Sequence, residues 1–271
     1  MEASNRQADA NDDLKVEEKS RQFKSTVRYV YAITDDTMER NYGKIGMDGA
    51  NVYTISQGAL AVVVSDTLNK KIRPERRKLT AHHDVIAKLM AERTVLPAAF
   101  GTMSGSAKSL LDMLKKNQTL FDQQLKRVSG KVEMGLNVAW NMHNISEYFV
   151  NQYPELAESR DDMLTRKGGP TRDQKIEVGR LFAQLLIRER EVRTKTVMRV
   201  LSRHCAEIKQ NKPRQDREVM RLACLVDRSD REKFEEEGIL LATKLFDDNY
   251  TFKFSGPWSP YNFVTGLRIN I

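Results

Sequence analysis

The chain has 271 residues, 40% of them hydrophobic, which is enough for one or two globular domains with a substantial core. With only two cysteines and no N-terminal apolar run before a cleavage site, the sequence indicates a protein of the reducing cytoplasm and excludes a disulfide scaffold. Apolar runs such as 59–64 fall far short of the ~20 residues of a membrane span, so no membrane span is expected, whereas the net charge of +8 raises the question of an acidic partner.

The N-terminal region changes character at Val27. Residues 1–24 mix acidic and basic side chains with almost nothing large and apolar, so they are expected to form a disordered tail. From Val27 to Ile33 the residues follow the two-residue period of a strand. Two further runs, 52–56 and 60–65, flank Gln57-Gly58, which suits a tight hairpin turn. These three strands predict an antiparallel unit.

A helix is expected to begin at Pro74, where the missing N–H matters least. Its apolar face is predicted from residues at three- and four-residue spacing: Leu79, His83, Ile86 and Met90. His82 and His83 are favoured as structural histidines over metal ligands, because no cluster at ligand spacing accompanies them beyond Asp84. The basic block at 70–78 favours a solvated helix start over a phosphate-binding patch, because no nucleic-acid motif accompanies it.

The rest of the chain predicts one more strand of this unit and then a second unit. Residues 95–102 read as a short strand, and a helix with one apolar stripe runs from Leu110 to Val128, where it is expected to join the two domains. The later elements are a strictly alternating strand at 131–140, a helical region at 142–211 broken at Pro154 and 168–170, a strand at 218–227, a helix at 231–244 and a strand at 250–254. This order describes an α+β sandwich of ferredoxin-like style.

Catalytic motifs are absent in usable form. The sequence offers no nucleophile with a base, no zinc spacing and no P-loop, and Gly43, Gly46 and Gly49 do not match the G-x-G-x-x-G order. Cys205 on a helix stripe and Cys224 on a strand face are expected to act as small buried hydrophobes. The residues alone therefore indicate a two-domain α+β protein without catalytic residues, cofactor or metal.

The segment from Phe254 to Val264 combines two prolines, a glycine and four aromatic side chains. Proline fixes φ and pushes the preceding residue toward extended geometry, so a stiff arm is expected to follow the last strand. This arm either seals a core edge or offers an aromatic anchor to an apolar partner. Of these alternatives, we expect Trp258 to close the core and Tyr261 or Phe263 to be the exposed anchor.

Several segments together resemble the gas vesicle protein F/L family (GvpF/GvpL) from residue 27 to residue 264. The most specific are Leu96-Pro97-Ala98-Ala99-Phe100-Gly101-Thr102 and Ser255-Gly256-Pro257-Trp258-Ser259-Pro260-Tyr261-Asn262-Phe263-Val264. Weaker matches lie in the strands and helix: Tyr29-Val30-Tyr31-Ala32-Ile33, Leu60 to Ser65, Leu79 to Ile86 and Val132-Glu133-Met134-Gly135.

The resemblance implies an α+β fold with an N-terminal α/β domain at 25–128, built on a small antiparallel sheet, and a C-terminal modified ferredoxin-like domain with added helices at 129–271. It also implies a non-catalytic accessory protein of gas vesicle assembly, located in the cytoplasm and at the vesicle. The implied partners are the small, apolar major shell protein and other vesicle accessory proteins, with no nucleic acid. The competing hypothesis is a basic nucleic-acid-binding α+β module. Candidate partner-binding residues are Trp258, Tyr261, Phe263 and Phe100.

Overall fold

The computed structural model describes residues 27–69, 71–165 and 168–265, so the predicted tail at 1–24 lies outside the described residues. The described chain divides into two compact units. The first holds residues 27–129 together with Val264 and Thr265, and the second is Gly130–Phe263. The domain boundary between residues 128 and 129 stays a prediction. The division into compact units assigns Val264 and Thr265, which follow Phe263, to the first unit.

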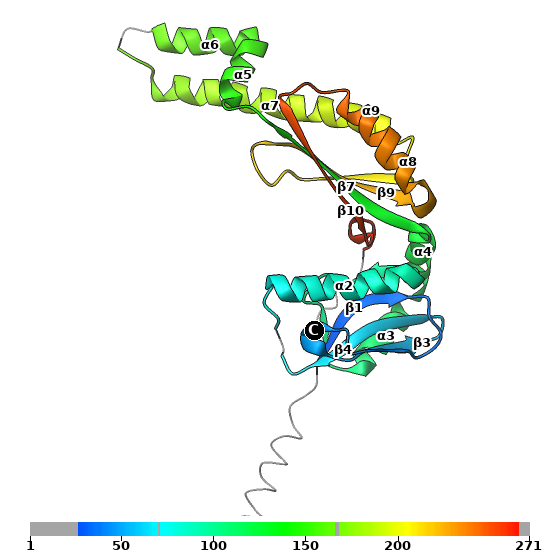
Figure 1. The fold of residues 1–271 in the computed structure, drawn as a ribbon. Coiled ribbons are helices and arrows are strands. Elements are labelled where there is room, and N and C mark those ends of the chain that lie inside the picture. The colour runs from blue at the N-terminus through cyan, green and yellow to red at the C-terminus, as the bar shows by residue number, and fades with distance from the viewer. Residues whose placement is uncertain (1–26, 70, 166–167, 266–271) are drawn as a thin grey trace, which may run out of the picture. The chain divides into compact units, whose positions relative to one another are not determined.

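The first unit is an antiparallel sheet with helices packed against it (Figure 1). Its strands are β1 (Val27–Thr34), β2 (Asn41–Gly43), β3 (Val52–Gln57), β4 (Leu60–Thr67), β5 (Val95–Pro97) and β6 (Met103–Ser104). Its helices are α2 (Arg76–Glu92), α3 (Ala107–Lys116) and α4 (Gln118–Val128), with a short 3-10 turn η1 (Met47–Gly49). The strand order is β2-β3-β4-β1-β5, and β6 also pairs with β1. Because consecutive residues of β4 from Leu60 to Ser65 are buried, both faces of this sheet are covered.

The predicted hairpin is confirmed, because β3 and β4 pair from Val52↔Ser65 to Gln57↔Leu60. The predicted face of α2 is wrong by about one residue. The buried positions are His82, Val85, Ile86 and Leu89, while His83 is exposed. The helix begins at Arg76 and not at Pro74. Its orientation follows from His82, whose ring is held between the Tyr29 hydroxyl and the Ala98 carbonyl.

Two further elements of the first unit differ from the prediction. The strand expected at 95–102 ends at Pro97, and the chain then turns through Gly101, whose φ is 85°, before β6 pairs with β1. The single helix expected from Leu110 to Val128 is two helices, because Asn117 ends α3 with its side-chain amide bonded to the Met113 carbonyl at 2.9 Å. Both helices belong to the first unit, with α3 on β3 and β4 and α4 on β5.

The second unit has the ferredoxin-like arrangement, which confirms the predicted fold class. Its strands are β7 (Lys131–Trp140), β8 (Glu207–Asn211), β9 (Glu218–Asp227) and β10 (Tyr250–Trp258), in the antiparallel order β10-β7-β9-β8. Between them lie the helices α5 (Ile145–Gln152), α6 (Pro154–Thr165), α7 (Arg172–Leu201), α8 (Arg231–Lys233) and α9 (Leu240–Thr243), with η2 (Arg228–Asp230), the π-helix η3 (Phe234–Ile239) and the terminal 3-10 turn η4 (Tyr261–Phe263). The chain order strand, helix, strand, strand, helix, strand is that of the ferredoxin fold.

The strand β8 corrects the prediction that residues 142–211 are helical. The helix α7 ends at Leu201, the Ala206 amide donates to the Leu225 carbonyl, and the chain continues as an edge strand beside β9. Cys205 therefore lies in the turn before β8 and not on a helix. The short, mostly polar sequence of β8 carries no alternation that would mark it as a strand.

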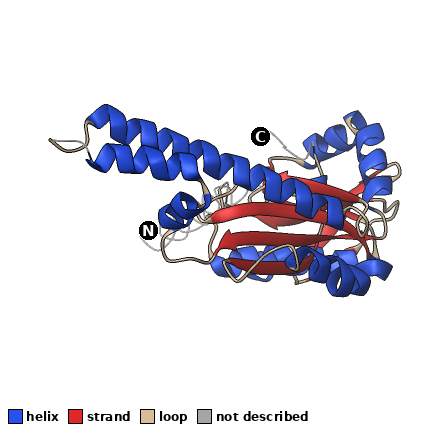
Figure 2. Ribbon diagram, turned by 90° about the horizontal axis from the view of Figure 1, so that it is seen from above, coloured by secondary structure: helices blue, strands red, loops and turns tan. Residues whose placement is uncertain are grey.

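The added helices extend this unit. The helices α6 and α7 lie alongside each other and reach past the ends of the strands (Figures 1 and 2). A capping box fixes the start of α7, because Thr171 and Gln174 bond each other's backbone amides. Within the described residues, no helix combines the length and apolar content needed to cross a bilayer.

Candidate functional site

The sheet of the second unit has two chemically different faces. On β7, Val132, Met134, Leu136, Val138 and Trp140 are buried on one face, and Lys131, Glu133, Gly135, Asn137 and Ala139 lie on the other. Helix α7 packs against β9 of the same sheet and Phe252 of β10 lies opposite Val138 on the apolar face. We call the face with Glu133, Gly135 and Asn137 the polar face.

The strand register arranges the polar face into three rows of cross-strand neighbours. The first, the basic row, contains Lys253, Asn137, Arg221 and Asn211. The second, the small row, contains Ser255, Gly135, Ala223 and Lys209. The third contains Trp258, Glu133, Leu225 and Glu207.

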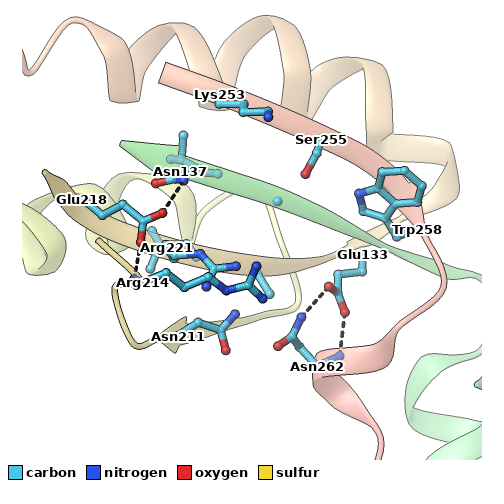
Figure 3. Close-up of a pocket in the computed structure, with 14 residues that line it drawn as sticks. Glu133, Asn137, Asn211, Arg214, Glu218, Arg221, Lys253, Ser255, Trp258 and Asn262 are labelled. Carbon is cyan, nitrogen blue, oxygen red and sulfur yellow. Dashed lines mark hydrogen bonds between the residues drawn. The ribbon is translucent and has the colours of Figure 1, made fainter. Parts of the chain in front are cut away.

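A hollow of about 340 Å3 lies over these rows (Figure 3). The hollow forms over the small row, because Gly135 and Ala223 carry almost no side chain there. A Cβ at Gly135 would lie 2.5 Å from the Ser255 Oγ, so a larger residue at this position must displace the β10 side chain. The basic row borders the hollow on one side, and the row with Trp258 and Glu133 borders it on the other.

The segment after β10 covers the Glu133 end of the polar face. The Asn262 backbone amide donates to Glu133 Oε2 at 2.8 Å, and the Asn262 side-chain amide donates to Glu133 Oε1 at 2.6 Å. Lys209 Nζ donates to the Asn262 carbonyl at 2.9 Å and lies 5.5 Å from the centre of the Phe263 ring. Burial raises the pKa of Glu133, although the bonds from Asn262 and the charge of Lys209 oppose the rise. Both carboxylate oxygens of Glu133 are therefore used within the chain.

The second carboxylate of the hollow, Glu218, is also hydrogen-bonded. The Asn137 side-chain amide donates to Glu218 Oε1 at 3.1 Å, and the Arg214 backbone amide donates to Oε2. Burial pushes the pKa of Glu218 up, but these hydrogen bonds and the nearby charge of Arg221 hold it below its ordinary value. Glu218 therefore stays ionised and has its own donors.

The basic side chains of the hollow differ from its acids in their contacts. Within the described part of the chain, the side chains of Arg214, Arg221 and Lys253 form no ion pair and no hydrogen bond. Arg214 and Lys253 are exposed and Arg221 is half-buried. The charge of Arg221 acts on Glu218, but the three bases outnumber the two acids of the hollow and form no ion pair with a described residue.

The aromatic residues predicted as partner contacts are distributed differently from the expectation. Trp258 is 47% exposed, whereas Phe263 is fully buried at 0%. The prediction that Trp258 closes the core is wrong, and of the two residues expected as the exposed anchor, Tyr261 or Phe263, the structure excludes Phe263, because β10 continues to Trp258 and the chain turns only at Ser259 and Pro260. Tyr261 is half-buried.

Phe100, the remaining predicted contact, belongs to the first unit. It is half-buried, and its ring packs edge-on against Tyr29 at 6.1 Å and against His82 at 5.7 Å. The four predicted residues thus do not form one site: Trp258 borders the hollow, and Tyr261 and Phe263 follow it in the segment beside Asn262. Whether any of them contacts a partner stays a prediction.

The histidine pair and the cysteines offer no competing site. His82 is buried, with Nδ1 at 2.9 Å from the Tyr29 hydroxyl and Nε2 at 3.2 Å from the Ala98 carbonyl. Burial and the neighbouring His83 lower the pKa of His82 to about 4. Cys205 is half-buried and Cys224 is buried, and both are free thiols. In the part of the chain that the structure covers, no three His, Cys, Asp or Glu residues are grouped as metal ligands.

The sequence did not single out Arg214, Arg221, Lys253 or Asn211. Gly135 was the available signal, because a glycine inside a strictly alternating strand marks a place where another group approaches closely. The basic row itself is formed by strand register, which a single strand does not reveal.

These features define a two-unit α+β protein whose second unit is ferredoxin-like and presents a polar hollow suited to binding. The chain matches the gas vesicle synthesis protein GvpL/GvpF family over residues 27–265, and it belongs to that family. This confirms the resemblance noted in the sequence.

Individual relatives agree with this assignment. Gas vesicle protein F of Streptomyces sp. (strain CB03234) is 26% identical, with 87% of this chain and 98% of the relative covered. Gas vesicle protein L1 of Halobacterium salinarum is 25% identical, covering 90% of this chain and 92% of the relative. The crystal structure of the gas vesicle protein GvpF from Anabaena sp. PCC7120 has a TM-score of 0.75 at 19% identity and covers 91% of this chain and all of that one, so it shares the fold.

Proposed function

We propose that this chain is a non-catalytic accessory protein of gas vesicle assembly that binds the apolar major shell protein, other accessory proteins, or both, in the cytoplasm and at the forming vesicle. Family membership supports the pathway, and the relatives of both F and L type are named as gas vesicle proteins. A shell subunit that assembles through apolar surface needs a binder that shields that surface until it is added.

The outer edge of β10 is the observation that carries the binding part of the proposal. Among the described strands β10 is at the end of its sheet, and an end strand presents backbone groups on its outer side to which a further strand can pair. Two aromatic side chains lie along it, Phe254 at 39% exposure and Trp258 at 47% exposure. Phe254 is opposite Leu136 on the apolar face, and Trp258 is opposite Glu133 on the polar face. A strand edge with aromatic anchors on both faces suits a partner segment that is itself apolar.

The alternative of a nucleic-acid-binding module has no specific observation in its favour. Within the basic block, Arg77 pairs with Asp48 and Lys78 pairs with Glu75. These pairs reduce the field that the block would offer to phosphates. Lys70, also part of the block, lies outside the described residues.

Co-purification tests the proposal. A tagged chain is expressed together with the other proteins of a gas vesicle gene cluster, and captured proteins are identified by mass spectrometry. We expect the shell protein or another vesicle accessory protein to co-purify at moderate salt. The double variant Phe254→Ser, Trp258→Ser should lose most of this capture, because anchors of this kind each contribute about 2 kcal/mol or more.

The matched control is Met38→Ser, which removes a side chain that is 66% exposed on the first unit. It should leave capture unchanged. Capture of no vesicle protein by the wild-type chain, or tight salt-sensitive capture of nucleic acid alone, would contradict the proposal.

A further inference from the structure

The acids of the polar hollow are hydrogen-bonded within the unit, whereas its bases can bind a ligand. Its two acids, Glu133 and Glu218, each accept hydrogen bonds from neighbouring groups of the same unit. Its three bases, Arg214, Arg221 and Lys253, form no ion pair with any described residue. An anion that enters the hollow therefore meets donors and cations without having to displace an internal partner.

The basic row places two of these bases, Lys253 and Arg221, on either side of Asn137. Lys253 is opposite Asn137 on β7, and Asn137 is opposite Arg221 on β9. Directly opposed residues of antiparallel strands have Cβ atoms ~4.5–5.5 Å apart, so one bound segment can reach both cations. Arg221 offers a planar fork that matches a carboxylate, and Lys253 offers a mobile single cation.

The size and remaining chemistry of the hollow restrict the occupant. A volume of about 340 Å3 is at the lower end of the range of ligand pockets, so it admits a few residues and not a folded domain. Asn211 and Ser255, which also line it, both donate and accept hydrogen bonds. The ionised Glu218 repels any anion, so it favours an occupant with few, spaced negative charges over a continuous run of phosphates. These features match a short peptide with carboxylate side chains better than a nucleic acid backbone.

We propose that the hollow on the polar face binds a short acidic peptide segment of a protein partner, with its carboxylates on Lys253 and Arg221. The hollow reaches Trp258 on β10, the strand edge where partner docking is proposed above. The inference rests on that proposed function and names the chemistry of the segment that enters beside the edge. Arg214, which also lines the hollow, adds a third cation (Figure 3).

Peptide binding by the full-length protein tests this inference. The probe is a labelled eight-residue peptide of alternating glutamate and threonine, and the matched probe has glutamine in place of each glutamate. Fluorescence anisotropy at moderate salt should show at least tenfold tighter binding of the glutamate peptide. The double variant Arg221→Gln, Lys253→Gln should lower that affinity at least tenfold.

Lys175→Gln is the matched control, because it removes one positive charge, as each substitution of the double variant does. Lys175 is exposed on α7 and does not line the hollow. This variant should bind the glutamate peptide as the wild type does. The single variant Lys253→Gln changes an exposed side chain and should keep the fold, so it replaces the double variant if that one proves unstable. It should weaken binding of the glutamate peptide several-fold.

Equal affinity for the two peptides, or a loss in the double variant no larger than in Lys175→Gln, would overturn the inference. So would a single-stranded RNA oligonucleotide that binds more tightly than the peptide and depends on the same two residues. The outcomes separate from those of the proposed function: a chain that captures vesicle proteins but ignores the glutamate peptide keeps its function and loses this site.

Discussion

Replacement of Phe263 by alanine should destabilise the second unit far more than replacement of Trp258. The Phe263 side chain is fully buried, and its loss is expected to cost about 3–5 kcal/mol, the range for a deleted buried aromatic. Loss of the cation–π contact between Lys209 Nζ and the Phe263 ring increases this cost by at most ~1 kcal/mol. Because Trp258 is 47% exposed, roughly half of its surface is already hydrated, and Trp258→Ala should cost about 2 kcal/mol at most.

The chain provides its own reporter for this comparison. It has two tryptophans, Trp140 and Trp258, and both belong to the second unit. Denaturant titrations followed by tryptophan fluorescence therefore report the unfolding of that unit, and Trp140, 2% exposed, remains as the probe in Trp258→Ala. A Phe263→Ala variant as stable as Trp258→Ala, or more stable, would refute this account of how the C-terminal segment packs.

Two further predictions concern buried polar groups. Because the pKa of His82 is lowered to about 4 from 6.5, the first unit should have its full stability above pH 6.5 and lose about 3 kcal/mol as pH falls from 6.5 to 4, with no further loss from this residue below. Thermal melts between pH 4 and 7 should show a much smaller pH dependence in His82→Gln and only a slightly smaller one in the exposed His83→Gln, because burial lowers the pKa of His82 more than the neighbouring His83 does; equal slopes in both variants would disprove the assignment. Asn262→Ala removes the side-chain donor to Glu133 and should destabilise the second unit by about 1.5–3 kcal/mol in fluorescence-monitored denaturation. A loss below ~0.5 kcal/mol would show that the Glu133–Asn262 pair does not hold the terminal segment.

Apolar residues at two-residue spacing made the long strands predictable. The strands at 131–140 and 218–227 match β7 and β9 residue for residue, because an apolar set on one face leaves only one register. The edge strand β8 was missed, because its residues are mostly polar and half-exposed and so carry no period. The helix face of α2 was misplaced because two hydrogen bonds orient the polar side chain of His82 toward the core, and apolar spacing does not report them.

The candidate site was less accessible to sequence reasoning. The prolines around Trp258 suggested a separate arm, whereas the structure extends β10 to Trp258 across an irregularity after Ser255. The buried aromatic residue of this segment is therefore Phe263, and not Trp258 as predicted. The basic row joins residues from four strands, and Lys253 and Arg221 become neighbours through Asn137 only once the strands are in register.

Vesicle formation in cells is the most direct measurement of the central claim. A strain that lacks this chain is complemented with the wild type, with Met38→Ser, or with Phe254→Ser, Trp258→Ser, and vesicles are counted by electron microscopy. We expect the deletion to abolish or sharply reduce vesicles, the wild type and Met38→Ser to restore them, and the folded double variant to fail. Normal vesicles in the deletion strain, or full restoration by the double variant, would contradict a role in assembly that acts through the β10 edge.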